Sequence, residues 1–183
     1  MRRLILLFVV VIVLWSCGGG GGGGSGPAPQ TFEGLIENVS TTKTFQTGSG
    51  RPAAVVFSPG VFVVHEESAP LFNAGQAPRP NGLESLAEDG NPSSIIESLS
   101  LLSGVTLIGV VRTPVGKEGT APIGPGESYR AVIRGSEGSS FSLALSFLQA
   151  NDLFVAPNEA GIPLFDANGV PISADVTASF ALW

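Results

Sequence analysis

The sequence contains one histidine and one cysteine, which restricts the chemistry that it can carry out. His65 is the only candidate for an imidazole base, and it ends an apolar run directly before Glu66 and Glu67. In many hydrolases such a base serves a serine that lies within a Gly-x-Ser-x-Gly motif. The sequence has no such motif, so we interpret His65 as a surface residue at a strand end and expect no catalytic residue.

Carboxylates offer the remaining candidates for chemistry. Glu66-Glu67 or Glu88-Asp89 could share acid–base work, but neighbouring acids in turns are more often solvated. Zinc requires more His and Cys ligands than the chain has, whereas calcium takes about 6–8 oxygen ligands, often from loops. The candidates for calcium are Asn151-Asp152 and the turn Asp166-Ala167-Asn168-Gly169. For the second we favour a hairpin turn, since Asn-Gly between short apolar runs is typical of one.

Cys17 closes an N-terminal segment with the features of an export leader. Arg2 and Arg3 precede an uncharged apolar run from Leu4 to Trp15. This run is shorter than the about 20 residues that span a bilayer, and its length is typical of a signal peptide. It ends in Leu14-Trp15-Ser16-Cys17, which resembles the bacterial lipobox. We therefore expect residues 1–17 to be a signal peptide with a lipobox and Cys17 to be lipidated; the alternative is a secretory leader with an incidental cysteine.

Residues 18–30 form a tether rich in glycine and proline, since a run of glycines neither packs nor orders readily. A diacylglycerol on Cys17 would hold the protein stably at a membrane. Gly18 stands where an aspartate would retain a lipoprotein at the inner membrane, so we expect an outer-membrane lipoprotein or a secreted protein. Residues 31–183 remain for one domain. The motif Asn38-Val39-Ser40 matches a glycosylation sequon, which in a bacterial lipoprotein we interpret as coincidental.

The charge of the chain is acidic and argues against nucleic acid as a partner. The formal net charge is −6, and removal of Arg2 and Arg3 with the leader would lower it to −8. Only Lys43 and Lys117 supply lysines, and no basic cluster is present. With one cysteine, no disulfide can form within the chain, so the domain must be stabilised by its core.

Alternating apolar residues and frequent Gly and Pro predict an antiparallel β-sandwich with one or two short helices. The clearest strand is Ser140–Phe147, in which Phe141, Leu143, Leu145 and Phe147 share one face and small polar residues share a wet face. Two apolar runs within Ala53–His65 flank a turn at Ser58-Pro59-Gly60. The remaining strands are predicted at Thr31–Val39, Val105–Arg112, Glu127–Arg134, Ile162–Phe165, Val170–Ser173 and Thr177–Trp183.

A helix is predicted after Asn91 and Pro92, which suit an N-cap and a first helical position. The residues Ile95, Ile96, Leu99 and Leu102 then recur at helical spacing. A further helical turn is predicted at Leu83–Glu88.

Several phrases of the sequence, taken together and in order, resemble the spondin domain family, in particular its bacterial secreted members. The resemblance covers about Thr31 to Trp183, and its most specific parts are Leu-Ala-Glu-Asp-Gly and Asn-Asp-Leu-Phe. The phrases lie within Thr31–Ser40, Ser58–His65, Gly82–Pro92, Gly124–Glu127 and Ser146–Phe154.

This resemblance implies an antiparallel β-sandwich of the kind found in animal matrix adhesion proteins, with calcium bound at one edge. Asp152 matches one calcium aspartate of the family, and two more would follow the final strand, beyond Trp183. The calcium site is therefore incomplete in this sequence, either because the sequence is cut short or because this member has lost the site. We expect a cell-envelope or secreted binding or adhesion module with an unknown protein or glycan ligand. The alternatives are a structural envelope lipoprotein without a discrete ligand and an envelope hydrolase with acidic catalytic residues.

Overall fold

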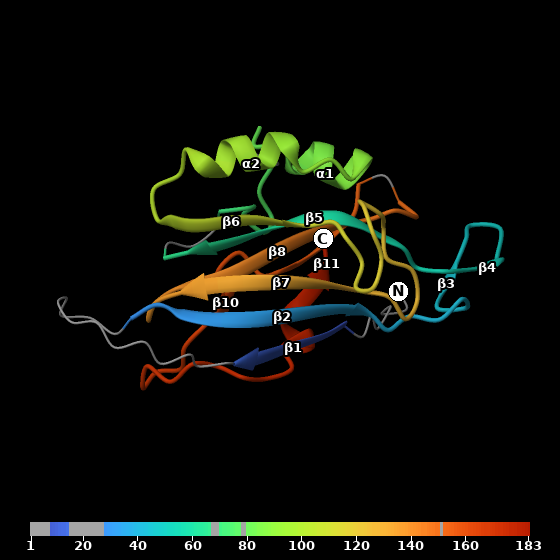
Figure 1. Cartoon of the computed structure of the whole chain (residues 1–183). Coiled ribbons are helices and arrows are strands. Elements are labelled where there is room, and N and C mark those ends of the chain that lie inside the picture. Colours follow the sequence, from blue (N-terminus) through green and yellow to red (C-terminus); the bar gives the residue numbers. More distant parts are fainter. Residues whose placement is uncertain (1–7, 15–27, 67–69, 78–79, 151) are drawn as a thin grey trace.

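Three layers make up the fold, namely a three-stranded sheet, a six-stranded sheet and a pair of short helices on the outer face of the larger sheet (Figure 1). This computed structural model describes residues 8–14, 28–66, 70–77, 80–150 and 152–183. Every strand pair is antiparallel. The predicted fold class, an antiparallel β-sandwich with one or two short helices, is confirmed.

The smaller sheet has the order β1-β2-β7, and its strands are β1 (Phe8–Leu14), β2 (Gln30–Asn38) and β7 (Ser128–Gly135). The larger sheet has the order β11-β9-β8-β5-β6, with β10 paired to β8. Its strands are β5 (Phe57–His65), β6 (Val105–Val111), β8 (Ser140–Phe147), β9 (Phe154–Pro157), β10 (Ile162–Pro163) and β11 (Phe180–Leu182). The remaining elements are β3 (Phe45–Gln46), β4 (Pro52–Ala53), α1 (Leu83–Asp89), α2 (Ser93–Ser100) and a 3₁₀ turn η1 (Thr177–Ser179).

The main core lies between the two sheets. The smaller sheet contributes the inward residues of β2 and β7, whose alternating burial matches the predicted pattern. The larger sheet contributes mainly aromatic and aliphatic residues of β5 and β8. Fully buried side chains of this core include Phe32, Ile36, Tyr129, Ile133, Phe57, Phe141 and Phe147. Burial of such side chains stabilises the fold by about 1.5–3 kcal/mol each, which compensates for the absence of a disulfide.

The second face of β8 is buried, so the prediction of a wet face on this strand is wrong. Ser142, Ala144 and Ser146 are all at most 3% exposed. The helices cover this face, and a second apolar cluster joins it to Leu86, Ile95 and Leu99. The small serines fit there because their hydroxyls find partners; Ser146 Oγ donates a hydrogen bond to the Ala87 carbonyl of α1, at 2.8 Å.

The predicted turn at Ser58-Pro59-Gly60 is also wrong, because β5 runs unbroken through these residues. The pairing of β5 with β8 shifts register between Phe57 and Gly60. A proline lacks the N–H that a sheet ladder needs, and a bulge of this kind is one of the few places where a strand accepts it. Ser58 then uses its hydroxyl to accept a hydrogen bond from the Ser146 backbone, at 3.0 Å.

Both predicted helices are present. The cap of α2 is one residue later than predicted, at Pro92, and Asn91 instead accepts a hydrogen bond from the Ser93 backbone N–H at 3.1 Å. The strands predicted at Ile162–Phe165 and Thr177–Trp183 are shorter than expected, because only β10 and β11 are extended and η1 occupies Thr177–Ser179. The strand predicted at Val170–Ser173 is wrong, since Pro171 forms only an isolated bridge there. The turn at Asp166–Gly169 is present, with Phe165 bridged to Pro171 across it.

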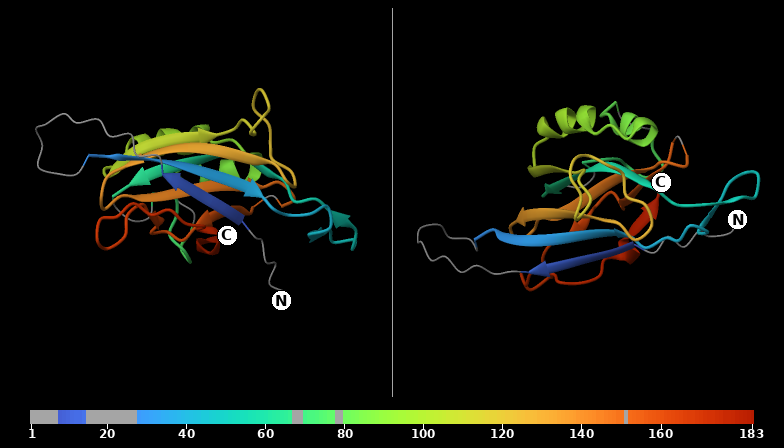
Figure 2. Two further views of the ribbon diagram at one scale, coloured as in Figure 1. Left: turned by 60° about the horizontal axis from the view of Figure 1, so that its bottom comes forward. Right: turned by 45° about the vertical axis from the view of Figure 1, so that its right-hand side comes forward.

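An extended arm, residues 39–54, leaves the sandwich after β2 and returns before β5 (Figure 2). It contains the two-stranded sheet of β3 and β4. Phe45 anchors its base by an edge-on contact with the Phe147 ring, at 5.4 Å between centroids. Its charged side chains, Lys43 and Arg51, are exposed, and the arm contains no acidic residue. Because Arg51 lies opposite Thr47 at the turn, it lies near the tip of the arm.

The two ends of β2 define two ends of the molecule. At the Gln30 end, Gln30 pairs with Gly135, the last residue of β7, and the chain then turns into β8. At the Asn38 end lie the first residues of β5, the last of β8 and the arm. Figures 1 and 2 show α1 and the arm at this same Asn38 end. Strand β2 therefore begins at one end of the sandwich, while the arm and α1 occupy the other.

The expected lipidation residue, Cys17, and most of the expected leader and tether lie outside the described residues. Within the expected leader, the backbone of Phe8–Leu14 forms β1 beside β2, with Phe8 opposite Asn38 and Leu14 opposite Phe32. In the part of the chain that the structure describes, no helix is long and apolar enough to cross a membrane.

Tyr129 gives the core an expected dependence on alkaline pH. Its ring is fully buried, and its hydroxyl donates a hydrogen bond to the Ala121 carbonyl at 2.6 Å. Burial raises the pKa of the Tyr129 phenol, and the nearby charge of Glu127 raises that pKa further. The unfolded phenol ionises near pH ~10 while the folded one stays neutral. Above about pH 10 the folded state therefore binds more protons, and the free energy of unfolding falls as pH rises.

We expect the free energy of unfolding in urea to fall between about pH 8 and about pH 11 more steeply in the wild type than in Tyr129→Phe. The variant is less stable by about 1 kcal/mol at the lower pH because it lacks the hydroxyl hydrogen bond, but it has no buried phenol to titrate. Equal pH slopes in the two proteins would assign the alkaline loss to other groups.

Candidate functional site

A pocket between α1 and the start of β9 brings together residues from two distant parts of the sequence. It has a volume of ≈ 270 Å³, and we name it the α1 pocket. It is lined by Leu83, Glu84, Ala87, Glu88, Asp152 and Phe154. The helix supplies four of these residues because positions one turn apart lie on one face, so that Leu83 pairs with Ala87 and Glu84 with Glu88.

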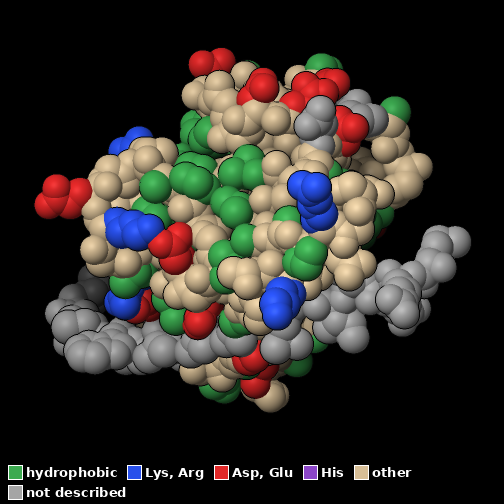
Figure 3. Space-filling view, turned by 90° about the vertical axis from the view of Figure 1, so that its right-hand side faces the viewer, with side chains coloured by type: hydrophobic (Ala, Val, Ile, Leu, Met, Phe, Trp, Pro, Cys, Tyr) green, Lys and Arg blue, Asp and Glu red, His purple; other side chains and the backbone are tan. Residues whose placement is uncertain are grey.

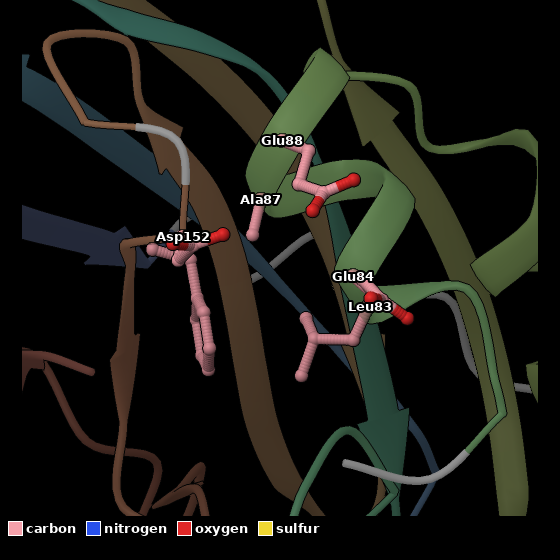
Figure 4. Close-up of a pocket in the computed structure, with 6 residues that line it drawn as sticks. Leu83, Glu84, Ala87, Glu88 and Asp152 are labelled. Carbon is pink, nitrogen blue, oxygen red and sulfur yellow. The ribbon is translucent and has the colours of Figure 1, made fainter.

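The α1 pocket combines an apolar interior with an acidic rim. Leu83 and Ala87 are buried, whereas Glu84, Glu88 and Asp152 are exposed. In Figure 4, Asp152 faces Ala87 across the pocket and Leu83 points into the space below them, while the carboxylates of Glu84 and Glu88 lie on the side of α1 away from Asp152. The three negative charges therefore do not converge on one point.

Aromatic residues continue the apolar interior behind the pocket. The ring of Phe154 meets Phe72 edge-on, with centroids 5.3 Å apart. Phe72 also contacts Trp183 at 4.8 Å, and the Trp183 indole donates a hydrogen bond to the Ala156 carbonyl at 3.0 Å. These contacts fix the position of Phe154 in the wall of the pocket.

The described donors around Asp152 do not fit a tight calcium site, and Asn151, its neighbour in the predicted candidate, lies outside the described residues. In the described residues, no three His, Cys, Asp or Glu side chains lie close enough to hold one metal ion. Calcium needs about 6–8 oxygens and several carboxylates for tight binding, whereas Asp152 stands apart from Glu84 and Glu88. We therefore derive no function through calcium.

The other calcium candidate, Asp166, serves its own turn. Its carboxylate accepts hydrogen bonds from the backbone N–H groups of Asn168, at 2.8 Å, and Val170, at 2.9 Å. These two backbone N–H groups hold the pKa of the Asp166 carboxyl below its usual value. The geometry is that of an Asx-type turn closed by Gly169, as the hairpin interpretation predicts.

His65 is buried, so its interpretation as a surface residue is wrong. It is 1% exposed, and its Nε2 lies 2.9 Å from Ser142 Oγ. The spacing suits a base and a nucleophile, but Gly161 covers the pair: a Cβ atom on Gly161 would lie 2.7 Å from the Ser142 hydroxyl and 2.8 Å from His65 Nε2. Because backbone seals this pair from solvent, its arrangement supports packing at the Gln30 end of β5 and not catalysis.

A second pocket of ≈ 210 Å³ lies at the Gln30 end. It is lined by Pro29, Glu66, Thr106, Leu107, Arg134, Gly135, Ser136 and Ser139. Glu66 is thus separated from Glu88, which lines the α1 pocket at the other end, and Glu67 lies outside the described residues. Pro29 belongs to the expected tether, which places this pocket beside the start of β2.

The sequence singled out Asp152 and Glu88 separately and gave no sign that they lie at one pocket. It also did not identify Leu83, Glu84, Ala87 or Phe154 as neighbours of Asp152. Only the pairing of β8 with β9 and the packing of α1 on β8 bring these segments together. No family model, curated protein or solved structure matches this chain.

Proposed function

We propose that this protein is an exported binding or adhesion module of the cell envelope, anchored by a lipid on Cys17 and resembling spondin domains, and that it is not an enzyme. The sequence supports export and anchoring through the leader and lipobox. The resemblance to spondin domains supports an adhesive role.

The arrangement of the two ends of the sandwich carries this proposal. A tether from Cys17 would reach the domain at Gln30, which begins β2. The α1 pocket and the arm lie at the opposite, Asn38 end (Figure 1). Nine residues of extended chain separate the ends by about 30 Å. A domain anchored in this way has its pocket and its arm at the end farther from the attachment of the tether, where an external partner can reach them.

Processing before Cys17 would also remove β1 from the edge of β2. Strand β2 would then pair with β7 alone and become an edge strand. Glu33 and Glu37, whose side chains are partly exposed on β2, would discourage pairing with other chains, as charged residues do on natural edge strands.

Lipidation can be tested with the chain produced with its own leader in a Gram-negative host. We expect radiolabelled palmitate to be incorporated into the wild type and the protein to sediment with outer membranes. Cys17→Ala should lose the label and leave the membrane fraction, since stable anchoring requires the acyl chains. A Ser25→Ala variant, altered within the tether, should behave as the wild type. Cys17→Ala protein that keeps the label would contradict the anchor.

Surface display can be tested on the same intact cells with trypsin. Lys43 is exposed on the arm, at the end that we place farthest from the membrane. Cleavage after Lys43 in intact cells is the expected result, and protection until the cells are lysed would contradict display on the outer surface.

Calcium offers a further test, for which the donor set of Asp152 predicts a negative result. We expect the melting temperature to be the same with calcium at about 10 mM and with chelator, because even weak extracellular calcium sites bind at about 10⁻⁴–10⁻³ M. A ligand at about 100 times its Kd would add about 2.7 kcal/mol, which shifts a melt by several degrees. A calcium-dependent rise that Asp152→Asn abolishes would restore the calcium-linked form of the proposal.

A further inference from the structure

The α1 pocket lies where two acidic segments of the chain meet. Residues 80–111 contain four acidic side chains and no Lys, Arg or His, and residues 135–183 contain five acidic side chains and again none of these cations. Glu84 and Glu88 come from the first segment and Asp152 from the second. The two ion pairs between described residues, Lys117–Glu127 and Arg130–Glu33, lie outside both segments. Figure 3 shows acidic side chains gathered over the helices at the top of this end of the molecule.

The shape of the α1 pocket suits one long side chain that ends in a positive charge. Its volume of ≈ 270 Å³ lies just below the about 300–1,000 Å³ that is usual for pockets that enclose a small molecule. Leu83, Ala87 and Phe154 provide an apolar wall for a methylene stem, and Asp152 provides a carboxylate at the opening. Arginine and lysine bury their stems in this way while their charged groups stay near water, and a guanidinium can also stack on an aromatic ring.

The spread of the three carboxylates distinguishes such a ligand from a metal ion. A divalent cation requires its ligands at one point, and the described residues contain no such group of three. A guanidinium presents five N–H donors over a plane, so it can bind Asp152 bidentately while Glu84 and Glu88 add attraction at longer range.

The arm at the same end of the molecule carries the complementary group. It has two cations and no acid, and it projects from the body with Arg51 exposed near its tip (Figure 2). Beyond the contact of Phe45 with Phe147, the two-stranded sheet of β3 and β4 stands apart from both large sheets. A two-stranded hairpin is only marginally stable in water by itself, so a second surface against which it packs would stabilise it.

We propose that the α1 pocket binds Arg51 from the arm of a second copy of this chain. Because the arm and the pocket lie at the same end, two copies that meet end to end exchange arms reciprocally and close as a two-fold dimer. This inference rests on the proposed binding function and identifies its partner as the protein itself. The tether leaves the Asn38 end free to meet a second copy on a facing membrane, since it attaches to the domain at the opposite, Gln30 end.

Variants that reverse the charge on the arm, in the pocket, or on both test the proposal. The full-length lipoprotein, purified in detergent, is examined by sedimentation equilibrium at low and high salt. We expect a dimer that weakens with salt. Arg51→Glu or Asp152→Lys alone should raise the dimer Kd at least about tenfold, because each places like charges together. The double variant, and a mixture of the two single variants, should associate again because the charges are once more opposite.

Glu97→Lys is the matched control, since it makes the same charge change at an exposed position of α2 outside the pocket. It should keep the wild-type Kd to within about threefold. Wild-type protein that stays monomeric, or double-variant protein that fails to regain association while its melting temperature matches the wild type, would overturn the proposal. The palmitate-labelling and trypsin experiments test anchoring and export without reference to dimerisation. A monomeric protein would therefore overturn the dimer and leave the proposed function standing.

Discussion

Gly60→Ala is expected to destabilise the protein by about 3 kcal/mol or more, one of the largest effects of any single methyl group in the chain. A Cβ atom on Gly60 would lie 2.2 Å from the Ala144 carbonyl oxygen and 2.3 Å from Leu145 Cδ2. The first of these atoms is backbone and cannot rotate away, so β5 and β8 would have to separate at the centre of the larger sheet. Urea unfolding followed by circular dichroism measures the loss.

Gly48→Ala is the matched control for this substitution. Gly48 lies in the arm, and a Cβ atom there would meet nothing within 4 Å. The control should change the free energy of unfolding by no more than about 0.5 kcal/mol. If Gly60→Ala protein unfolds at the same urea concentration as the control, β5 and β8 do not pack as closely at Gly60 as described here.

Gly60 also shows why local sequence signals misled at β5. Ser-Pro-Gly is a strong turn signal, since proline and glycine interrupt regular structure in most contexts. Here each residue has a role within a strand: Pro59 occupies the shifted register, Ser58 accepts a hydrogen bond from Ser146, and Gly60 admits the neighbouring backbone. These roles depend on β8, which lies about eighty residues further along the chain, and no local pattern contains that information.

The periodicity of β2, β7 and β8 did predict the strands and the residues of the main core. Alternation reports which residues share a face, and that much is local. It could not report that α1 and α2 cover the other face of β8, because Ser142 and Ser146 are small polar residues that suit water or a satisfied interior equally well. The same ambiguity concealed the burial of His65, whose partner Ser142 lies on that face.

The candidate site depended still more on long-range packing. Asp152 was a calcium candidate from its residue type and from a resemblance, and the resemblance placed its companions among acids after the last strand. The structure instead places it across a pocket from α1, a helix that precedes it by more than sixty residues and that carries Glu84 and Glu88. The charge pattern was nonetheless present in the sequence, since both segments lack any cation over their whole length. What the sequence could not supply was that they adjoin at the end that also carries the basic arm.

Asn38 connects stability with this arrangement, because its side chain joins the two ends of the arm. It is 1% exposed, and its amide donates hydrogen bonds to the carbonyls of Val55, at 3.0 Å, and Ile123, at 3.1 Å. Its amide oxygen accepts from the Ser40 hydroxyl at 2.6 Å and from the Ser40 backbone N–H at 3.2 Å. The arm leaves the domain directly after Asn38 and returns at Val55, so one amide fixes both points. The sequon formed by these residues therefore has a structural role.

We expect Asn38→Ala to lower the free energy of unfolding by about 2–4 kcal/mol, since it removes the side-chain donor of the Val55 carbonyl and the partner of Ser40. The Ile123 carbonyl loses one of its two donors and keeps the Phe57 backbone N–H. Asn38→Asp should cost at least as much at neutral pH, because it turns a donor into an acceptor facing those carbonyls. Urea unfolding of both variants measures these losses.

The surface asparagine Asn158 provides the control for Asn38. It is exposed and accepts one local hydrogen bond, from the Ala160 backbone N–H at 3.1 Å, so Asn158→Ala should cost no more than about 1 kcal/mol. Because Asn38 fixes the base of the arm, its variants should also weaken the dimer under conditions in which they remain folded, whereas Asn158→Ala should not. Asn38→Ala protein that matches the wild type in both stability and association would show that the arm is positioned by other contacts, with Phe45 the first to be examined.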